Sequence, residues 1–300
     1  MSRHFFTLDV FTTRRLSGNP LAVVLNSEGL SDAEMQSIAA EFNLSETVFV
    51  LPPDDPANRA KIRIFTPVHE LPFAGHPTVG TAVLLSTLDN AEDGASFVLE
   101  ERVGPVTCFI SEDSGIRSAR FQMPKLPSAY EWDEDIKLLA DALGLKKKDI
   151  GFGKHKPAVW DAGVPYALVP VRTLEAMQRI VVDPAKAIAC EPEVNGFRAN
   201  IYAYCEGGEE DHSDYHARMF AHSAGIPEDP ATGSAAAAFC GQLATLEMKK
   251  NETRSFMIEQ GYEMGRPSQI FLAITRKDGE VSSATISGSA VEISEGMLRY

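Results

Sequence analysis

The feature that most constrains the fold of this chain is an internal repeat at about half its length. The segment KIRIFTPVHELPFAGHPTVGTAVLL in the first half matches ARMFAHSAGIPEDPATGSAAAAF in the second half. Arg63 and Arg218 each begin an arginine-apolar-phenylalanine strand, and Pro72 and Pro227 each lie nine residues further on. Both prolines are followed by a turn of very small residues and a small apolar helix. This order predicts two copies of one α/β unit.

A second pair of segments follows the same repeat. SGNPLAVVL and DAGVPYALVPV each place a glycine two residues before the proline that opens an apolar strand. Between the two matched segments of the first half, SDAEMQSIAAEF predicts a helix with Ser31 as its N-cap and Glu34 at the capping-box position. The segment GHPTVGTAVLLSTL predicts a buried helix because it is apolar almost all round. The segments ASFVLEER, GPVTCFISE and IRSARFQMP predict antiparallel strands, and DEDIKLLADALGL predicts a helix.

Composition limits the class of protein. The 300 residues are 44% apolar, which is enough for packed cores and argues against disorder. A net charge of −14 argues against nucleic acid and anionic membranes as partners. No run approaches the roughly 20 apolar residues of a membrane span, and the N-terminus lacks a signal-peptide pattern. The four cysteines lie far apart, so we expect a cytoplasmic globular protein without disulfides.

Glu46 and His76 are the first candidates for chemistry. Glu46 lies in NLSETVFV, between Ser45 and an apolar run that predicts a strand. A carboxylate at the edge of an apolar strand can be partly desolvated, which suits a general acid or base near neutral pH. A surface glutamate at the start of a strand is the alternative. His76, in AGHPT, can shuttle a proton or orient a ligand at a helix start, or it can simply cap or pack there.

The segment EDPATGSAAAA is the second candidate. Thr232, Gly233 and Ser234 open its helix with almost no side-chain bulk. The first N–H groups of a helix have no partner within the helix, so an uncovered start can bind an anion. Asp229 can orient a neighbouring group. The alternative is a tight helix entry in which Ser234 is a cap and Asp229 supplies ordinary charge near the helix dipole.

Other patterns are weak. HELPFAGH places His69 and His76 seven residues apart and does not match the metalloprotease pattern, and GFGKHK lacks the third glycine of a dinucleotide-binding turn. In DHSDYH, His212 and His216 lie four residues apart in an acidic segment, which indicates a solvated charge cluster rather than a metal site. We therefore expect no metal, flavin or nicotinamide cofactor.

Five segments together closely resemble the phenazine-biosynthesis PhzF-like family. They are GNPLAVV, NLSETVFV, FTPVHELPFAGHPT, RMFA…GIPEDPATGSA and QGYEMGRPS, and the resemblance runs from Phe5 to about Leu298. It implies the α+β fold of diaminopimelate epimerase, with two pseudo-symmetric domains that each wrap a curved sheet or barrel around a central helix. The expected domains are residues 1–124, with 287–300 returning to them, and 125–286.

The resemblance also implies roles for matching residues, in a site between the two domains. Glu46 would be the acid/base carboxylate, with His76, Asp229 and Ser234 as its catalytic partners. The expected substrate-binding residues are Asn19, Ser45, Gly75, Thr232 and Gly233. The ligand would be a small carboxylic acid, and members of the family are commonly homodimers.

Three functions remain open at this point. A cofactor-independent isomerase would move a proton between carbons of a small, cyclic or aromatic-like carboxylic acid, as in phenazine biosynthesis. An epimerase or racemase of an amino or imino acid would use two bases, which in the epimerase relatives are cysteines at the two helix starts. AGHPT and DPATG contain no cysteine, and Cys240 lies six residues beyond Ser234. A non-catalytic protein that binds carboxylates needs no general base, so the full residue set favours an isomerase.

Overall fold

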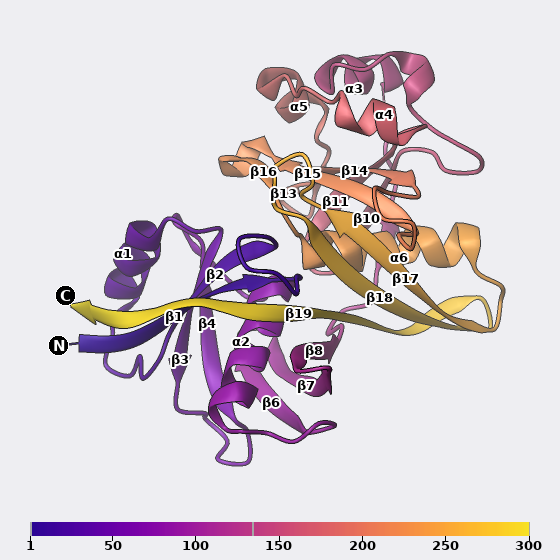
Figure 1. Cartoon of the computed structure of the whole chain (residues 1–300). Coiled ribbons are helices and arrows are strands. Elements are labelled where there is room, and N and C mark those ends of the chain that lie inside the picture. Colours follow the sequence, from indigo (N-terminus) through magenta and orange to yellow (C-terminus); the bar gives the residue numbers. More distant parts are fainter. Residues whose placement is uncertain (1, 134, 300) are drawn as a thin grey trace. The chain divides into compact units, whose positions relative to one another are not determined.

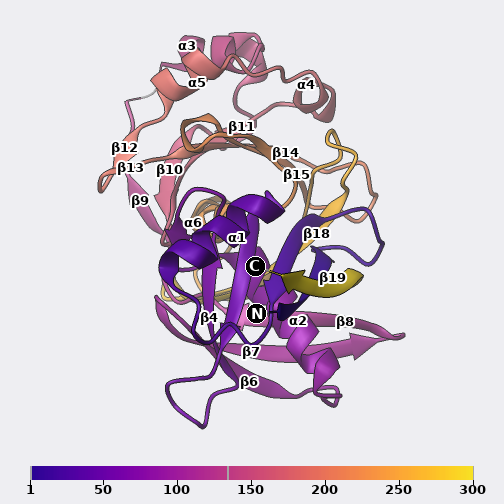
Figure 2. The ribbon, with the colours of Figure 1, turned by 90° about the vertical axis from the view of Figure 1, so that its left-hand side faces the viewer.

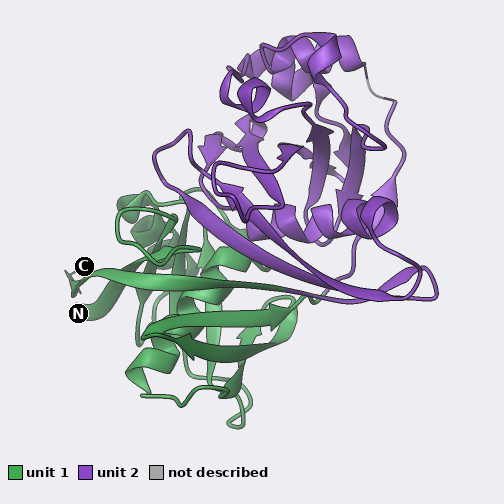
Figure 3. Ribbon diagram, turned by 45° about the vertical axis from the view of Figure 1, so that its right-hand side comes forward, with its two compact units in different colours: residues 1–124, 286–300 green, residues 125–285 purple. Residues whose placement is uncertain are grey.

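The computed structural model describes residues 2–133 and 135–299. The chain divides into two compact units, coloured separately in Figure 3. Unit 1 comprises residues 1–124 and 286–300, and unit 2 comprises residues 125–285. No helix in the described part of the chain has the length and apolar character to cross a lipid bilayer.

Unit 1 is a mostly antiparallel sheet with two helices (Figure 1). Its last strand, β19 (Glu280–Arg299), belongs to unit 1 from Ile286 onward and pairs antiparallel with β1. The other elements are β1 (Ser2–Val10), β2 (Asn19–Val24), α1 (Asp32–Phe42), β3 (Glu46–Leu51), β4 (Ala60–Phe65), β5 (Glu70–Leu71), α2 (Gly75–Leu88), β6 (Ser96–Glu101), β7 (Gly104–Asp113) and β8 (Ile116–Gln122).

Unit 2 has more helices on the outside of its sheet. Figure 2 shows β10, β11, β14 and β15 as an arc with α3, α4 and α5 on its outer side. Its elements are β9 (Ser128–Tyr130), α3 (Ile136–Ala142), η1 (Lys147–Asp149), β10 (Ala158–Asp161), β11 (Pro165–Pro170), α4 (Leu174–Gln178), α5 (Pro184–Cys190), β12 (Glu193–Val194), β13 (Phe197–Arg198), β14 (Asn200–Glu206), β15 (Tyr215–Ala221), η2 (His222–Ala224), β16 (Ile226–Asp229), α6 (Gly233–Glu247), β17 (Glu252–Gln260) and β18 (Ser268–Lys277).

The two units repeat the same pairing of strands. In unit 1, β1–β2 is antiparallel, β2–β3 parallel, β3–β4 antiparallel, β4–β6 parallel and β6–β7 antiparallel. In unit 2, β10–β11, β11–β14, β14–β15, β15–β17 and β17–β18 follow the same sequence of directions. Helices α2 and α6 occupy equivalent places in this order. The predicted α+β fold with two pseudo-symmetric units is therefore confirmed.

Each unit is built around a central helix that is buried on all sides except in its last turn. Helix α2 packs against β1, β2, β3, β7 and β8, and α6 packs against β9, β10, β11 and β18. Small residues allow this enclosure: a methyl group added to Gly80 would lie 2.6 Å from side-chain carbons of Val10 and Leu21. In α6, the same addition at Gly241 would meet the Trp160 ring at 2.1 Å. The buried helix predicted from GHPTVGTAVLLSTL is confirmed.

The N-terminus of helix α1 has the capping residues that the sequence predicts. Ser31 is its N-cap, and its hydroxyl accepts a hydrogen bond from the backbone N–H of Glu34 at 3.3 Å. The Glu34 carboxylate accepts in return from the Ser31 N–H at 2.8 Å. The predicted capping box is therefore confirmed.

The repeated arginines form the same interaction in both units. Arg63 donates two hydrogen bonds to the Glu70 carboxylate, each 2.8 Å long, and Arg218 does the same to Glu228. Each guanidinium also lies 5.1 Å from the centre of the phenylalanine ring two residues later. Glu70 and Glu228 each stand five residues before the first residue of the central helix. The arginine therefore fixes the strand that leads into that helix.

We expect Arg218→Lys to lower the free energy of unfolding by about 2–4 kcal/mol, because lysine cannot form the two-bond contact with Glu228. The variant also loses the hydrogen bonds that Arg218 donates to the carbonyls of Met177 and Ile180. Urea denaturation measures the change. Arg120→Lys, on an exposed strand position, is the control and should change stability by less than about 0.5 kcal/mol. Equal effects of the two substitutions would contradict this role.

Candidate active site

Unit 1 brings Glu46 and His76 together. Glu46 is the first residue of β3 and His76 the second residue of α2, which packs against that strand. The His76 Nδ1 atom lies 3.2 Å from Glu46 Oε2, and the side chains are 4% and 15% exposed. The expected acid/base carboxylate therefore has the expected histidine beside it and is largely shielded from water.

His76 is a neutral partner for this carboxylate. Burial lowers the pKa of His76 to about 3, and the nearby Pro20 carbonyl only partly opposes that effect. At neutral pH the ring carries no charge, so its contact with Glu46 is not an ion pair. A neutral imidazole can orient the carboxylate without cancelling the negative charge that a general base needs.

Helix α2 begins without a side-chain cap. Its N-cap residue, Ala74, has extended backbone geometry and offers no side-chain acceptor. Gly75 and His76 follow it, both buried. The first N–H groups of a helix carry partial positive charge and lack partners within the helix. This helix start is therefore suited to stabilising a carboxylate or a developing negative charge.

Unit 2 contains a different set at the equivalent helix start. Asp229 ends β16 and is 6% exposed. The Thr232 hydroxyl donates a hydrogen bond to Asp229 Oδ2 at 2.5 Å, and Thr232 therefore does not cap α6 with its side chain. Ser234, the second residue of α6, places its hydroxyl oxygen 2.7 Å from the Tyr166 hydroxyl.

The repeat makes the two helix starts directly comparable. Gly75 and Gly233 are the first helical residues, and His76 and Ser234 are the second. The second residue contacts a paired strand position in each unit. In unit 1 that position is Glu46, whose register partner on β2 is Leu21. In unit 2 the strand position equivalent to Glu46 is Asn200, which pairs with Tyr166 on β11. Here the residue that contacts Ser234 is Tyr166.

The remaining predicted residues lie at strand and helix starts of their own units. Asn19 is the fully buried first residue of β2, and Ser45 directly precedes β3. Sequence reasoning gave no role to Tyr166 or to Gln260. Tyr166 lies in an apolar strand, and a buried tyrosine hydroxyl usually needs a hydrogen-bond partner, so the sequence could have indicated a polar contact there. Gln260 belongs to the QGYEMGRPS segment, but its contacts are too distant in sequence to infer.

The expected solvated cluster around His216 was wrong. His216 is 0% exposed within β15, and its ring bonds to two carboxylates, Glu259 at 2.5 Å and Glu263 at 3.0 Å. The Ser213 hydroxyl donates to Glu259 at 2.6 Å. These bonds outweigh the effect of burial and raise the pKa of His216 to about 9. The position is buried because β17 brings Glu259 alongside β15, and Glu263 lies in the turn that follows β17.

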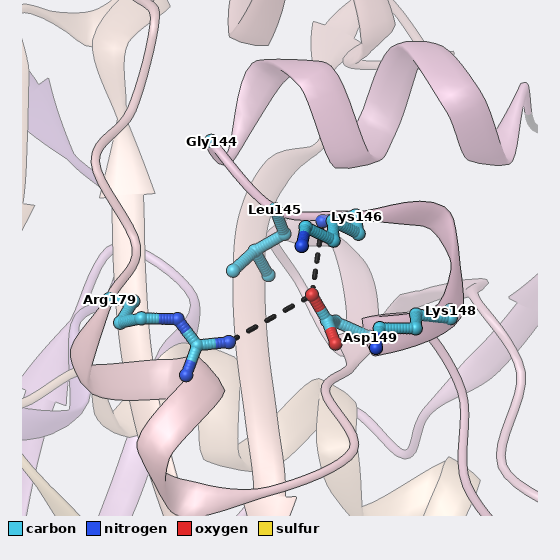
Figure 4. Close-up of a pocket in the computed structure, with 6 residues that line it drawn as sticks. All are labelled: Gly144, Leu145, Lys146, Lys148, Asp149 and Arg179. Carbon is cyan, nitrogen blue, oxygen red and sulfur yellow. Dashed lines mark hydrogen bonds and ion pairs between the residues drawn. The ribbon is translucent and has the colours of Figure 1, made fainter.

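A cavity of about 210 Å³ in unit 2 lies apart from these residues. Figure 4 shows its lining, in which the Asp149 carboxylate faces the backbone N–H of Lys146 and the Arg179 guanidinium. The other lining residues are Gly144, Leu145 and Lys148. Asp149 already offsets part of the positive charge, and no predicted acid/base residue lines the cavity.

Comparisons with known proteins agree with this fold. A crystal structure of a PhzF-family phenazine biosynthesis protein from Bacillus anthracis matches with a TM-score of 0.91 over 100% of both chains, at 26% identity. The family model described as phenazine biosynthesis-like protein matches residues 8–296. The chain therefore belongs to the phenazine biosynthesis-like (PhzF) family, as its motifs predicted.

Two relatives of similar length are isomerases by name. An uncharacterised isomerase of Mesorhizobium japonicum is 47% identical over 298 residues, covering 99% of each chain. The trans-2,3-dihydro-3-hydroxyanthranilate isomerase of Pseudomonas aeruginosa is 34% identical over 293 residues, covering 97% of this chain and 98% of the relative. These relatives support an isomerase.

Glu101 is a buried acid beside the start of α2. The Thr78 hydroxyl oxygen lies 2.8 Å from both the Ala74 carbonyl and Glu101 Oε1. A hydroxyl has one proton, so Thr78 donates either to the Ala74 carbonyl or to Glu101 Oε1. Burial raises the pKa of Glu101 to about 8, despite the opposing contact with Thr78. Glu101 is therefore mostly uncharged at neutral pH.

The free energy of unfolding of Glu101→Gln, compared with that of the wild type, should increase as pH rises. An unfolded glutamate ionises near pH 4.5, whereas folded Glu101 ionises near pH 8. Between these values the folded state holds the extra proton, so the contribution of Glu101 to stability falls as pH rises and levels off above pH 8. Glutamine does not titrate. Urea unfolding at pH 5.5 and 8 should show the variant gaining about 1–3 kcal/mol over the wild type; a pH-independent difference would contradict the assignment.

Proposed function

We propose that the protein is a cofactor-independent isomerase that moves a proton between two carbons of a small cyclic carboxylic acid. The observation that carries this proposal is the shielded Glu46 carboxylate beside a neutral His76. A carboxylate in this setting is partly desolvated, which makes it a stronger base for proton abstraction from carbon.

The proposed reaction needs only one proton carrier. Glu46 removes a proton from carbon, and the electron pair of that C–H bond enters the conjugated system of the substrate. The carboxylic proton of Glu46 exchanges with water in a fraction of turnovers. The protonated Glu46 then donates a proton to a different carbon, which forms the new C–H bond and regenerates the carboxylate. No oxidant or reductant is required. His76 holds Glu46 in place through both steps.

The helix starts supply the second part of the proposal. We assign substrate binding to Asn19, Ser45 and the backbone at Gly75 and Gly233. N–H groups at a helix start stabilise the substrate carboxylate and the negative charge that forms on the substrate during proton transfer. Asp229 and Ser234 are proposed to serve the same reaction from unit 2, with Tyr166 fixing the Ser234 hydroxyl.

The first compound to test is trans-2,3-dihydro-3-hydroxyanthranilate, the substrate named for the Pseudomonas aeruginosa relative. It is a small cyclic carboxylic acid, as the proposed site requires. A role in phenazine-like biosynthesis and a homodimer, which the family resemblance implies, belong to the same proposal. The proposed cytoplasmic location comes from the composition of the chain.

An epimerase is the less favoured reaction. Direct inversion needs one base on each face of the carbon, but the helix starts differ: His76 meets a carboxylate, and Ser234 meets a tyrosine. Cys240 does not replace the missing base, because burial raises its pKa to about 12 and keeps its thiol protonated. The third possibility, carboxylate binding without catalysis, predicts no exchange of carbon-bound hydrogen.

Glu46→Gln should abolish isomerisation because it keeps the side-chain size and removes proton transfer, a step worth about 10²- to 10⁴-fold in rate. The assay incubates enzyme and substrate in deuterated water and follows carbon-bound deuterium by mass spectrometry. Glu41→Gln, on an exposed face of α1, is the matched control and should retain full activity. A fully active Glu46→Gln enzyme would contradict the proposed base.

Gly233→Val should weaken carboxylate binding by about tenfold or more while the folded protein survives, because a side chain would cover the N–H groups at the start of α6. Calorimetric titration with the substrate carboxylate and a thermal unfolding curve measure affinity and stability on the same sample. If Gly233 serves only packing, the thermal midpoint falls and the affinity of the remaining folded protein is unchanged. That second result would refute the anion-binding role.

A further inference from the structure

Three buried side chains in unit 2 form a directed chain of hydrogen bonds that ends on Asp229. We propose that Thr232 and Gln260 are positioning residues that hold the Asp229 carboxylate for the reaction, and that the Thr232 hydroxyl does not contact substrate. The inference rests on the proposed function, in which Asp229 serves the reaction. It departs from the sequence-based expectation that Thr232 binds substrate.

The backbone fixes the orientation of the Gln260 amide. Its Oε1 atom accepts from the backbone N–H of Thr232 at 3.2 Å, and its Nε2 group donates to the backbone carbonyl of Asp229 at 2.7 Å. A backbone N–H can only donate and a carbonyl can only accept. The two ends of the amide are therefore distinguished by their partners, which removes the usual ambiguity between them.

This orientation determines where the Thr232 proton goes. Gln260 Nε2 lies 3.0 Å from the Thr232 hydroxyl oxygen and can only donate to it. The hydroxyl therefore accepts from Gln260, and its single proton remains for Asp229 Oδ2, 2.5 Å away. Asp229 is thus held as a hydrogen-bond acceptor, which favours the ionised carboxylate.

The surrounding structure gives this chain little freedom. Gln260 is 0% exposed, and Thr232 and Asp229 are 7% and 6% exposed. The next residue, Gly261, packs closely on the same turn: an added methyl group would lie 2.6 Å from the Pro230 carbonyl oxygen and 2.5 Å from that of Arg266. Gln260 is also paired with Ser268 at the end of the β17–β18 ladder. Few side-chain arrangements fit this space.

Three substitutions test the chain of bonds. Thr232→Val keeps the shape and removes the hydroxyl, whereas Thr232→Ser keeps the hydroxyl. Gln260→Glu replaces the donor by an acceptor, which draws the Thr232 proton away from Asp229. Thr232→Val and Gln260→Glu should each lower kcat about 10- to 100-fold, the value of one hydrogen bond to a charged group, with KM within about threefold of wild type. Thr232→Ser should stay within about threefold of wild type in both constants.

Different results would overturn the inference. A raised KM with unchanged kcat in Thr232→Val would show that the hydroxyl binds substrate. Wild-type activity in Thr232→Val, or a Thr232→Ser enzyme as impaired as Thr232→Val, would also refute the positioning role. Thermal unfolding curves identify a variant that fails to fold, and Gln260→Glu then provides the test with Thr232 intact.

A measurement without substrate separates this inference from the proposed function. Carbon-13 NMR of labelled aspartate follows the titration of Asp229 in each folded variant. Thr232→Val and Gln260→Glu should move the titration midpoint of Asp229 to higher pH, and Thr232→Ser should leave it near the wild-type value. Identical midpoints in all four proteins would refute the chain of bonds. A wild-type enzyme without isomerase activity would count against the proposed function and would leave this result standing.

Discussion

Each unit of this protein depends on enclosing a helix that is buried on all sides except in its last turn. The backbone of such a helix satisfies itself except at its ends, where the first N–H groups need partners from outside the helix. The N-cap residues of α2 and α6 provide no such partner with their own side chains. The enclosure also requires small residues, because neighbouring side chains leave no space for a Cβ atom at Gly80 or Gly241. Packing and the proposed anion binding therefore depend on the same local sequence.

The repeat keeps the backbone of that helix start and changes the side chains around it. In unit 1 the second helical residue is His76, beside a carboxylate, whereas in unit 2 it is Ser234, beside a phenol. A carboxylate can accept a proton from a substrate and return it, whereas a pair of hydroxyl groups offers no acid or base with a pKa near neutral pH. This divergence favours one proton carrier over two opposed bases, and hence isomerisation over direct inversion.

Features that depend on neighbouring residues were predictable from the sequence. The Ser31–Glu34 capping box lies within one helical turn, and the apolar run of α2 shows its burial directly. The family motifs also point to Glu46 and His76, which the structure places side by side. Contacts between distant residues were not predictable, because nothing local to Gln260 identifies Thr232, 28 residues away, as its partner.

His216 shows why local polarity can mislead. Its neighbours in the sequence are acidic and polar, which is typical of a solvated loop. The residues that surround it in space come from β17 and the turn after it, more than 40 positions further along the chain. Burial of a charged histidine becomes tolerable only because two carboxylates and their own hydrogen bonds accompany it. Such compensation is a property of the tertiary structure.

The buried polar groups also connect stability with the proposed chemistry. In both units an arginine holds a glutamate five residues before the central helix, through Glu70 in unit 1 and Glu228 in unit 2. In unit 2 the next residue after that glutamate is Asp229, which Thr232 and Gln260 fix from the other side. The turn into α6 is thus held at both ends by charged or amide hydrogen bonds. Because proton transfer is sensitive to displacements of about 1 Å, a rigid approach to the helix start would serve the proposed reaction as well as the fold.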